Sequence, residues 1–252
     1  MNDLFNIKGK KAIVTGGTKG LGFSMAEALM DAGCEVAVIG STDKIYDAAD
    51  NWKEKGYIVY PVKADLSIKE ENFRAFNEAI SYLGDIDILV CAAGMITRHI
   101  SNEFPLDEWE KTINLNLNST FIFCKEAGKI MLKKGYGKII NVASMCSYFG
   151  GQTVPAYSAT KGAVMQLTKA LSNDWAGKGI NVNAIAPGYM ATDMTKAIRE
   201  NNERYNEITK RIPKGRWGTK DDMKGATLFL ASRASDYLCG AIIPVDGGYL
   251  CK

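Results

Sequence analysis

This sequence of 252 residues has no long apolar run and no closely paired cysteines. No apolar segment approaches the ~18 residues that a membrane-spanning helix needs, so we expect no membrane association. The N-terminal segment from Met1 to Lys11 is polar and basic, and it lacks the apolar centre of a signal peptide. The six cysteines show no C-x-x-C spacing, which argues against a disulfide framework or a metal site and predicts a protein of the reducing cytoplasm.

Charge of one sign is also scarce. The 31 basic and 28 acidic residues give a formal net charge of +3, which is too small to favour nucleic acid binding. Hydrophobic residues make up 46% of the chain and charged residues 23%, as in an ordinary globular protein with a sizeable core. We find no internal repeat, low-complexity tract or linker, so residues 1–252 are expected to form a single domain.

Short β-rich or apolar runs alternate with stretches of helical periodicity along the whole chain. Helices are predicted from about Leu21 to Gly33 and over Ile68–Leu83, Glu108–Lys133 and Ala156–Ala176. Alternation of this kind predicts an α/β fold with a doubly wound parallel sheet of seven strands and helices on both faces. The predicted strands are Lys11–Thr15, Glu35–Ile39, Ile58–Val62, Ile86–Cys91, Lys138–Val142, Asn181–Ile185 and Ala241–Val245.

A polar segment at about 190–213 follows these predicted helices and comes before the last helix of the chain. In a parallel α/β fold such a segment would lie over the carboxyl edge of the sheet, where ligands bind. We expect either a substrate lid or a pair of surface helices there, and the sequence favours neither.

A glycine-rich turn follows the first predicted strand and opens the first helix. Its glycines stand at positions 16, 20 and 22, which is not the usual G-x-G-x-x-G spacing. Glycines let the chain turn sharply and bring its backbone against a pyrophosphate at the positive end of a helix. At the start of a βαβ series this turn predicts a nucleotide site, although elsewhere such a turn is often only a turn.

Tyr157 and Lys161 are four residues apart, so on a helix their phenol and ammonium lie on the same face. A free tyrosine titrates near ~10 and is a poor base at neutral pH. A cation beside it favours the phenolate and lowers the tyrosine pKa toward the range of an acid–base catalyst. Since the same pair is common on ordinary helix faces, its weight depends on the surrounding motifs.

Together these motifs resemble the short-chain dehydrogenase/reductases over essentially the whole chain. The resemblance rests first on Thr15-Gly16-x-x-x-Gly20-x-Gly22 and on Tyr157-x-x-x-Lys161, with Ser144 thirteen residues before Tyr157 (157 − 144 = 13). Cys91 replaces the asparagine that is usual in the family's Asn-Ala-Ala-Gly turn, which raises a question about local stability. The other matching segments are Asp65-Leu66, Ala92-Ala93-Gly94, Asn116, Pro187-Gly188 and Thr192.

The resemblance implies a single-domain Rossmann fold that binds NAD or NADP, and it implies a catalytic role for Asn116, Ser144, Tyr157 and Lys161. Tyr157 would exchange a proton with the substrate oxygen, and Ser144 would donate a hydrogen bond to that oxygen. Lys161 would lower the tyrosine pKa and hold the nicotinamide ribose, and Asn116 would keep a water that links Lys161 to solvent. The implied cofactor-binding residues, besides Tyr157 and Lys161, are Gly16, Thr18, Lys19, Gly20, Leu21, Gly22, Ser41, Asp65, Leu66, Ala92, Ala93, Gly94, Pro187, Gly188 and Thr192.

The choice between the two cofactors stays open at this stage. An acid at the end of the second strand would accept from the ribose hydroxyls and reject a 2′-phosphate, but Gly40-Ser41 occupies that place. Lys19 and Ser41 are suited to a 2′-phosphate, which favours NADP. The nearest relatives implied by the resemblance favour NAD.

The segments at 180–192, 211–218 and 229–237 resemble the sugar-acid dehydrogenases of the family, first those for 2-dehydro-3-deoxy-D-gluconate at C5 and next gluconate 5-dehydrogenases. These interconvert a C5 alcohol and ketone, so the pocket should offer a cation and polar donors. Arg98 is the expected carboxylate partner and His99 a hydrogen-bond donor beside it, unless the two are merely a solvated arginine and a loop histidine. Gln152 and Tyr189 are expected to line the substrate site with Ser144 and Tyr157.

Other functions remain possible. A 3-oxoacyl carrier-protein reductase or general ketone reductase would have an apolar, open pocket and favour NADPH. A catalytically silent NAD(P)-sensing regulator would be expected to lack the tyrosine, lysine or serine, and all three are present. The resemblance also implies a homotetramer, packed through the C-terminal strand and two long central helices.

Overall fold

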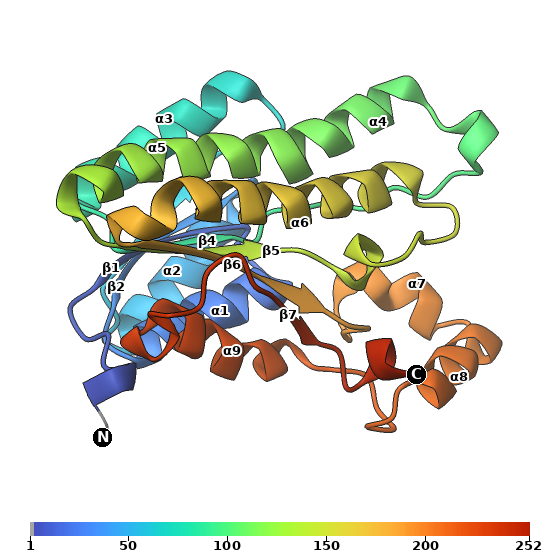
Figure 1. Ribbon diagram of the computed structural model, residues 1–252. Coiled ribbons are helices and arrows are strands. Elements are labelled where there is room, and N and C mark those ends of the chain that lie inside the picture. The colour runs from blue at the N-terminus through green and yellow to red at the C-terminus, as the bar shows by residue number, and fades with distance from the viewer. Residues whose placement is uncertain (1–2) are drawn as a thin grey trace.

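The computed structural model describes residues 3–252, and Met1 and Asn2 of the polar N-terminal segment lie outside the described residues. It contains one seven-stranded sheet in the order β3-β2-β1-β4-β5-β6-β7, with every neighbouring pair parallel (Figure 1). The order reverses between β1 and β4, which opens a crevice at the carboxyl ends of these strands. The strands are β1 (Lys11–Thr15), β2 (Glu35–Gly40), β3 (Val59–Lys63), β4 (Ile88–Cys91), β5 (Gly137–Val142), β6 (Ile180–Pro187) and β7 (Ile242–Val245).

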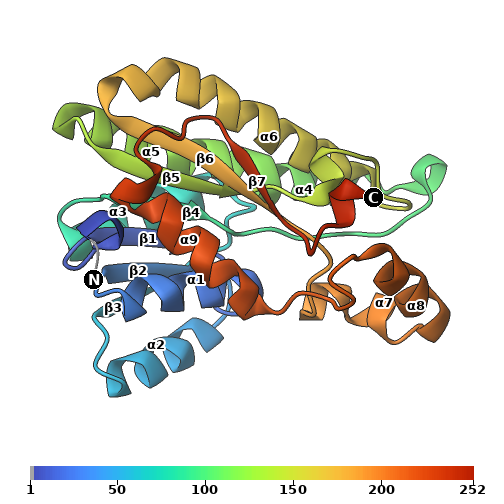
Figure 2. The same ribbon diagram turned by 60° about the horizontal axis from the view of Figure 1, so that its bottom comes forward.

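Helices cover both faces of the sheet, each over its own hydrophobic core. One core packs α1, α2 and α9 against one face through residues such as Met25, Trp52 and Leu230. The other packs α3, α5 and α6 against the opposite face (Figures 1 and 2). In this second core Phe76 lies edge-on to Phe123. The helices are α1 (Gly20–Asp31), α2 (Lys44–Glu54), α3 (Lys69–Leu83), α4 (Leu106–Ile113), α5 (Ser119–Lys134), α6 (Pro155–Trp175), α7 (Lys196–Arg199), α8 (Asn202–Arg211) and α9 (Lys224–Ala231).

The fold class predicted from the sequence is confirmed, with each predicted strand found within about two residues of its observed bounds. The predicted helix Glu108–Lys133 is different in one respect, because a π-helical turn at Asn114–Asn118 separates α4 from α5. Among residues 3–252, no helix combines the length and apolar character required to cross a membrane.

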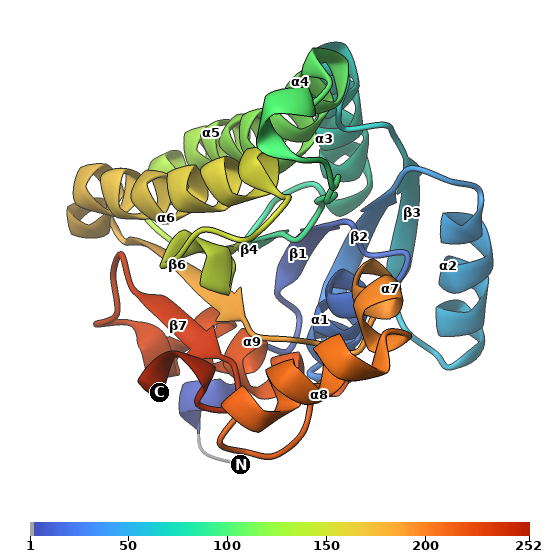
Figure 3. The same ribbon diagram turned by 90° about the vertical axis from the view of Figure 1, so that its right-hand side faces the viewer.

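The polar segment at about 190–213 forms the short helices α7 and α8. They lie together at the end of the sheet where the strands terminate, outside the two main helical layers (Figure 3). α8 is held there by Ile208 and Ile212, which are buried in a small cluster with Trp217 and Tyr249. The segment is therefore a pair of short helices at the ligand-binding edge, and its role as a substrate lid stays a prediction.

Candidate active site

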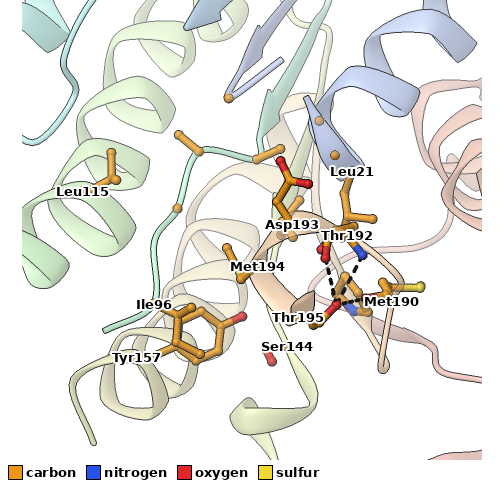
Figure 4. A pocket seen from close by; sticks show the side chains of 18 of the residues that line it. Leu21, Ile96, Leu115, Ser144, Tyr157, Met190, Thr192, Asp193, Met194 and Thr195 are labelled. Atoms are coloured by element: carbon orange, nitrogen blue, oxygen red, sulfur yellow. Dashed lines mark hydrogen bonds between the residues drawn. The ribbon is translucent and has the colours of Figure 1, made fainter. Parts of the chain in front are cut away.

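A cavity of about 1140 Å³ lies at the carboxyl ends of the strands. Its walls come from the turn after β1, the end of β2, the loops after β4, β5 and β6, the start of α6, and the segment around α7 and α8. Every residue that the sequence predicted for cofactor binding lines this cavity. Figure 4 shows Tyr157 and Ser144 at the end of the cavity away from Leu21.

The glycine turn brings the backbone after β1 against the turn after β4. Gly16 has φ +69, and a side chain there would meet the backbone of Ala93 at 2.7 Å, so only glycine fits. Thr15 Oγ1 joins the two turns by accepting hydrogen bonds from the backbone N–H groups of Ala92 and Ala93, each at 3.1 Å. The turn leads directly into the N-terminus of α1, an arrangement that favours an anionic ligand.

Thr18, in the same turn, has a buried Oγ1 without a hydrogen-bond partner among the described residues. Gly40 lies so close to this oxygen that any side chain at position 40 would overlap it. Buried hydroxyls are normally hydrogen-bonded, so the turn fits a bound group that supplies an acceptor. The residues present therefore fit a dinucleotide whose pyrophosphate lies against the turn.

The ribose end of the cavity carries cations and hydroxyls. Ser41, Thr42 and Lys44 line it beyond Gly40. Lys19 of the glycine turn lines the same cavity, and its ammonium lies 3.3 Å from Asp193 Oδ2. Asp43, the first acid after the end of β2, instead pairs with Lys63 at 2.7 Å. Thr42 and Lys44 were not predicted from the sequence, although Lys44 stands only three residues beyond Ser41. This end suits a phosphate better than a free ribose hydroxyl pair.

Tyr157 and Ser144 form the reacting end. Ser144 follows β5, and its Oγ is fixed by accepting the Cys146 N–H at 3.1 Å. Burial raises the pKa of Tyr157 to about 12, and the hydrogen bond with Ser144 and the charge of Arg98 oppose that rise. Tyr157 is therefore held in its protonated form in the free protein, ready to donate to a substrate oxygen.

Lys161 was predicted to lower the pKa of Tyr157, but in the free protein its ammonium has another partner. Its ammonium donates to the carbonyl of Val142 at 2.6 Å and lies 5.7 Å from the centre of the Tyr157 ring. Burial lowers the pKa of Lys161 itself to about 8. Because the ammonium is directed to a carbonyl, Lys161 does not offset the raised pKa of Tyr157 in the free protein. The hydrogen bond with Ser144 and the charge of Arg98 are the two influences that oppose the rise.

Asn116 lies in the π-helical turn, fully buried beside the cavity wall. Its Oδ1 accepts the Met95 N–H at 2.8 Å, and its Nδ2 donates to the Met95 carbonyl at 2.9 Å and to Thr160 Oγ1 at 3.2 Å. Since both amide hydrogens are used, the side chain joins the loop after β4 to α6. The water expected at Asn116 stays a prediction, because Oδ1 has a second lone pair that can accept from it.

Arg98, Gln152 and Tyr189, predicted to contact the substrate, all line the cavity, but His99 does not. The Nε2 of His99 lies 3.0 Å from Glu108 Oε2 on α4, and its ring packs against Phe104. His99 therefore contacts Glu108 and Phe104 and does not line the cavity. Sequence reasoning missed Arg204 of α8, which does line the cavity, because only the tertiary fold brings α8 there.

Comparison with known proteins agrees with this geometry. A family model described as Enoyl-(Acyl carrier protein) reductase matches residues 16–250. The 2-dehydro-3-deoxy-D-gluconate 5-dehydrogenase of Bacillus subtilis (strain 168) is 46% identical over 252 residues, covering 100% of this chain and 99% of the relative. The enzyme of the same name from Escherichia coli (strain K12) is 43% identical over 249 residues, covering 98% of both.

The fold is also similar to that of a solved structure. The gluconate 5-dehydrogenase from Burkholderia cenocepacia J2315, in complex with NADP and tartrate, has a TM-score of 0.95 at 35% identity and covers 99% of this chain and 98% of its own. The family match, the full-length relatives and the cavity at the switch point of the sheet all indicate NAD(P)-dependent oxidation and reduction. This chain therefore belongs to the short-chain dehydrogenase/reductase family and is an NAD(P)-dependent oxidoreductase.

Proposed function

We propose that this enzyme interconverts the C5 alcohol and ketone of a six-carbon sugar acid, as a 2-dehydro-3-deoxy-D-gluconate 5-dehydrogenase. The observation that carries the proposal is the full-length identity of 43–46% to relatives of that name. The polar wall supports it, because Arg98, Gln152 and Tyr189 offer the cation and donors that a carboxylate with several hydroxyls needs. An apolar acyl chain would leave these groups unpaired.

The proposed mechanism assigns one task to each catalytic residue. The nicotinamide ring, when bound, accepts or supplies the hydride. Tyr157 donates its proton to the carbonyl oxygen during reduction and takes it back during oxidation, while Ser144 Oγ hydrogen-bonds the same oxygen where charge develops. Lys161 holds the nicotinamide ribose, and Asn116 positions the loop after β4 through Met95. We also propose NADP as the preferred cofactor, because Ser41 and Lys44 line the ribose end and Lys19 lines the same cavity.

The direct test is turnover with purified protein, followed by the absorbance of the reduced nicotinamide. The panel contains 2-dehydro-3-deoxy-D-gluconate, D-gluconate with 5-keto-D-gluconate, and a 3-oxoacyl thioester. We expect the highest kcat/KM with 2-dehydro-3-deoxy-D-gluconate, and Tyr157→Phe should reduce turnover by about 10²–10⁴-fold while leaving cofactor binding intact. A preference for the thioester would overturn the proposal, and cofactor binding without turnover of any substrate would favour the sensor.

Gluconate 5-dehydrogenase is the second candidate, because solved structures with that name share almost the whole fold. The two substrates differ at C2 and C3. Gluconate has a hydroxyl at both carbons, whereas 2-dehydro-3-deoxy-D-gluconate has a ketone at C2 and no hydroxyl at C3. The same panel separates them, because the favoured acid must exceed the other in kcat/KM by at least about tenfold, or 1.4 kcal/mol.

Three further properties belong to the proposal. Residues 1–252 form one catalytic domain in which the segment at about 190–213 is the substrate lid, supported by Thr192, Met194, Ile198 and Arg204 in the cavity wall. The enzyme is a homotetramer, supported by the exposed apolar side chains considered in the Discussion. It works in the cytoplasm, supported by six cysteines that are all free.

A further inference from the structure

Two arginines from separate parts of the chain reach the same cavity. Arg98 follows β4, and Arg204 stands in the first turn of α8. The other cations in the cavity wall are occupied or lie elsewhere. Lys161 donates to the Val142 carbonyl and Lys19 pairs with Asp193. Lys44 lies beyond Gly40, and Lys111 acts on Asp65. A substrate carboxylate can therefore pair with Arg98 or with Arg204.

The two arginines differ in the groups that they influence. The charge of Arg98 acts on Tyr157, so Arg98 lies near the reacting oxygen. The charge of Arg204 acts instead on Tyr189 and Tyr249. Tyr189 lines the cavity, shares a hydrogen bond with Tyr249 and packs on Trp217 at the base of α8. Arg204 thus lies at the part of the cavity wall where Tyr189 and its neighbour Tyr205 both pack on Trp217.

The geometry of the proposed substrate then decides between them. If the reacting carbon is C5, four carbon–carbon bonds of about 1.5 Å each separate it from the carboxylate carbon. An extended sugar acid therefore places its charge roughly 5 Å or more from the atom that faces Tyr157. Arg98 is better placed for the reacting oxygen and its neighbouring hydroxyl.

We propose, resting on the sugar-acid function given above, that Arg204 of α8 binds the substrate carboxylate, with the Tyr189 hydroxyl beside it. In the free protein the Arg204 guanidinium pairs with Glu207 one turn along the helix, and the two side chains are 43% and 56% exposed. A pair so exposed contributes little to stability, so a carboxylate desolvated in the cavity can replace Glu207. The guanidinium then binds it with two parallel hydrogen bonds.

α8 can offer this side chain because the turns of the helix that follow Arg204 are fixed. Ile208 and Ile212 are buried, the Trp217 indole N–H donates to Thr209 Oγ1 at 2.9 Å, and Tyr205 stacks on Trp217. α8 is therefore a rigid support for the Arg204 side chain. This assignment gives the lid a chemical task, recognition of the charged end of the substrate.

The test compares 2-dehydro-3-deoxy-D-gluconate with its C1 amide, which keeps the length and removes the charge. For Arg204→Met we expect KM for the acid to rise about 10- to 100-fold and KM for the amide to change little, because a hydrogen-bonded charge pair is lost only with the acid. Arg204→Lys should fall between wild type and Arg204→Met, because it keeps the charge but not the paired donors. Lys210→Met, at an exposed position on the same helix outside the cavity wall, is the matched control and should behave as wild type.

Two outcomes would overturn the assignment. If KM for acid and amide rise together in Arg204→Met, the residue supports α8 and does not read the carboxylate. If Arg98→Met abolishes the preference for the acid and Arg204→Met does not, the carboxylate lies at Arg98. Failure of the proposed function has a different signature, since wild type itself would then show no preference for the acid over the amide.

Discussion

Lys161 shows most clearly, at the scale of single residues, how the fold sets protonation in the cavity. The protein buries an ammonium against a backbone carbonyl, which stabilises one hydrogen bond but removes the charge from water. Its pKa falls from 10.5 to about 8 for this reason. The folded state therefore binds this proton less tightly than the unfolded chain does, and stability must depend on pH.

The sign of that dependence follows from proton binding. Between about pH 8 and 10.5 the unfolded chain carries a proton on this lysine that the folded protein has lost, so the free energy of unfolding rises with pH. Relative to Lys161→Met, wild type should gain about 1 kcal/mol per pH unit across that window. Urea unfolding of both proteins at several pH values measures the difference. Tyr157 is common to both, so its titration largely cancels, and a difference that stays flat would contradict the shift.

Ser41 provides a second prediction at this scale. Ser41→Asp should lower the ratio of kcat/KM for NADP to that for NAD by at least about tenfold, or 1.4 kcal/mol, because a carboxylate repels a 2′-phosphate and accepts from ribose hydroxyls. Ser41→Asn, similar in size and neutral, is the control and should keep most of the wild-type ratio. Steady-state kinetics with both cofactors decide it, and an equal loss in the two variants would mean that size rather than charge is responsible.

The residues that could be predicted from the sequence are those whose chemistry requires a fixed order along the chain. Tyr157, Lys161, Ser144 and the glycine turn belong to this group, and all line the cavity. Arg204 could not be found this way, because nothing in the sequence of α8 indicates which of its charges faces a cavity. His99 was wrongly predicted to line the substrate site. It contacts Glu108 instead, and only the structure reveals the path of the loop that brings the two together.

Strands β4 and β5 answer the question raised by Cys91, at the scale of elements. Cys91 is buried on β4 and stands opposite Asn141 of β5 in the parallel register. The Asn141 side chain accepts from Cys124 Sγ at 3.4 Å and donates to Thr168 Oγ1 at 3.0 Å, which joins β5 to α5 and α6. An asparagine thus still braces the centre of the sheet, on the neighbouring strand.

Asn141→Ala should therefore reduce the free energy of unfolding by about 1–3 kcal/mol, because it leaves the buried Thr168 hydroxyl with one partner fewer. Cys91→Ala removes only a small buried thiol from the same place and is the matched control, with a smaller expected loss. Denaturant unfolding measures both. An equal loss in the two variants would show that packing, not the amide, stabilises this junction.

The π-helical turn between α4 and α5 marks what periodicity cannot predict. The segment from Glu108 to Lys133 has a helical pattern throughout, so an uninterrupted helix was expected. The turn places Asn116 where it bonds both backbone groups of Met95, a contact between elements that no local pattern contains. α2 was also not predicted, because it buries only Ile45, Ala49 and Trp52 beneath a polar surface.

Two surfaces remain apolar at the scale of the whole molecule. Leu106 of α4 is 77% exposed, and Phe121 is 46% exposed on α5, a helix that also supplies core residues. β7 ends the sheet at one edge, and its residues are only partly covered. An uncovered strand edge and exposed large apolar side chains favour association with another subunit. These features support the proposed homotetramer.

Charges introduced on the helical surface should separate its subunits. Leu106→Glu combined with Phe121→Glu should yield a species of lower mass by light scattering, because two carboxylates would be desolvated in the contact. Tyr46→Glu, an equally exposed aromatic on α2 at 46%, is the matched control and should leave the mass unchanged. If wild type is monomeric, or if the α4–α5 variant keeps the wild-type mass, this surface does not hold the subunits together. Activity of the separated subunits then shows whether each chain carries a complete site.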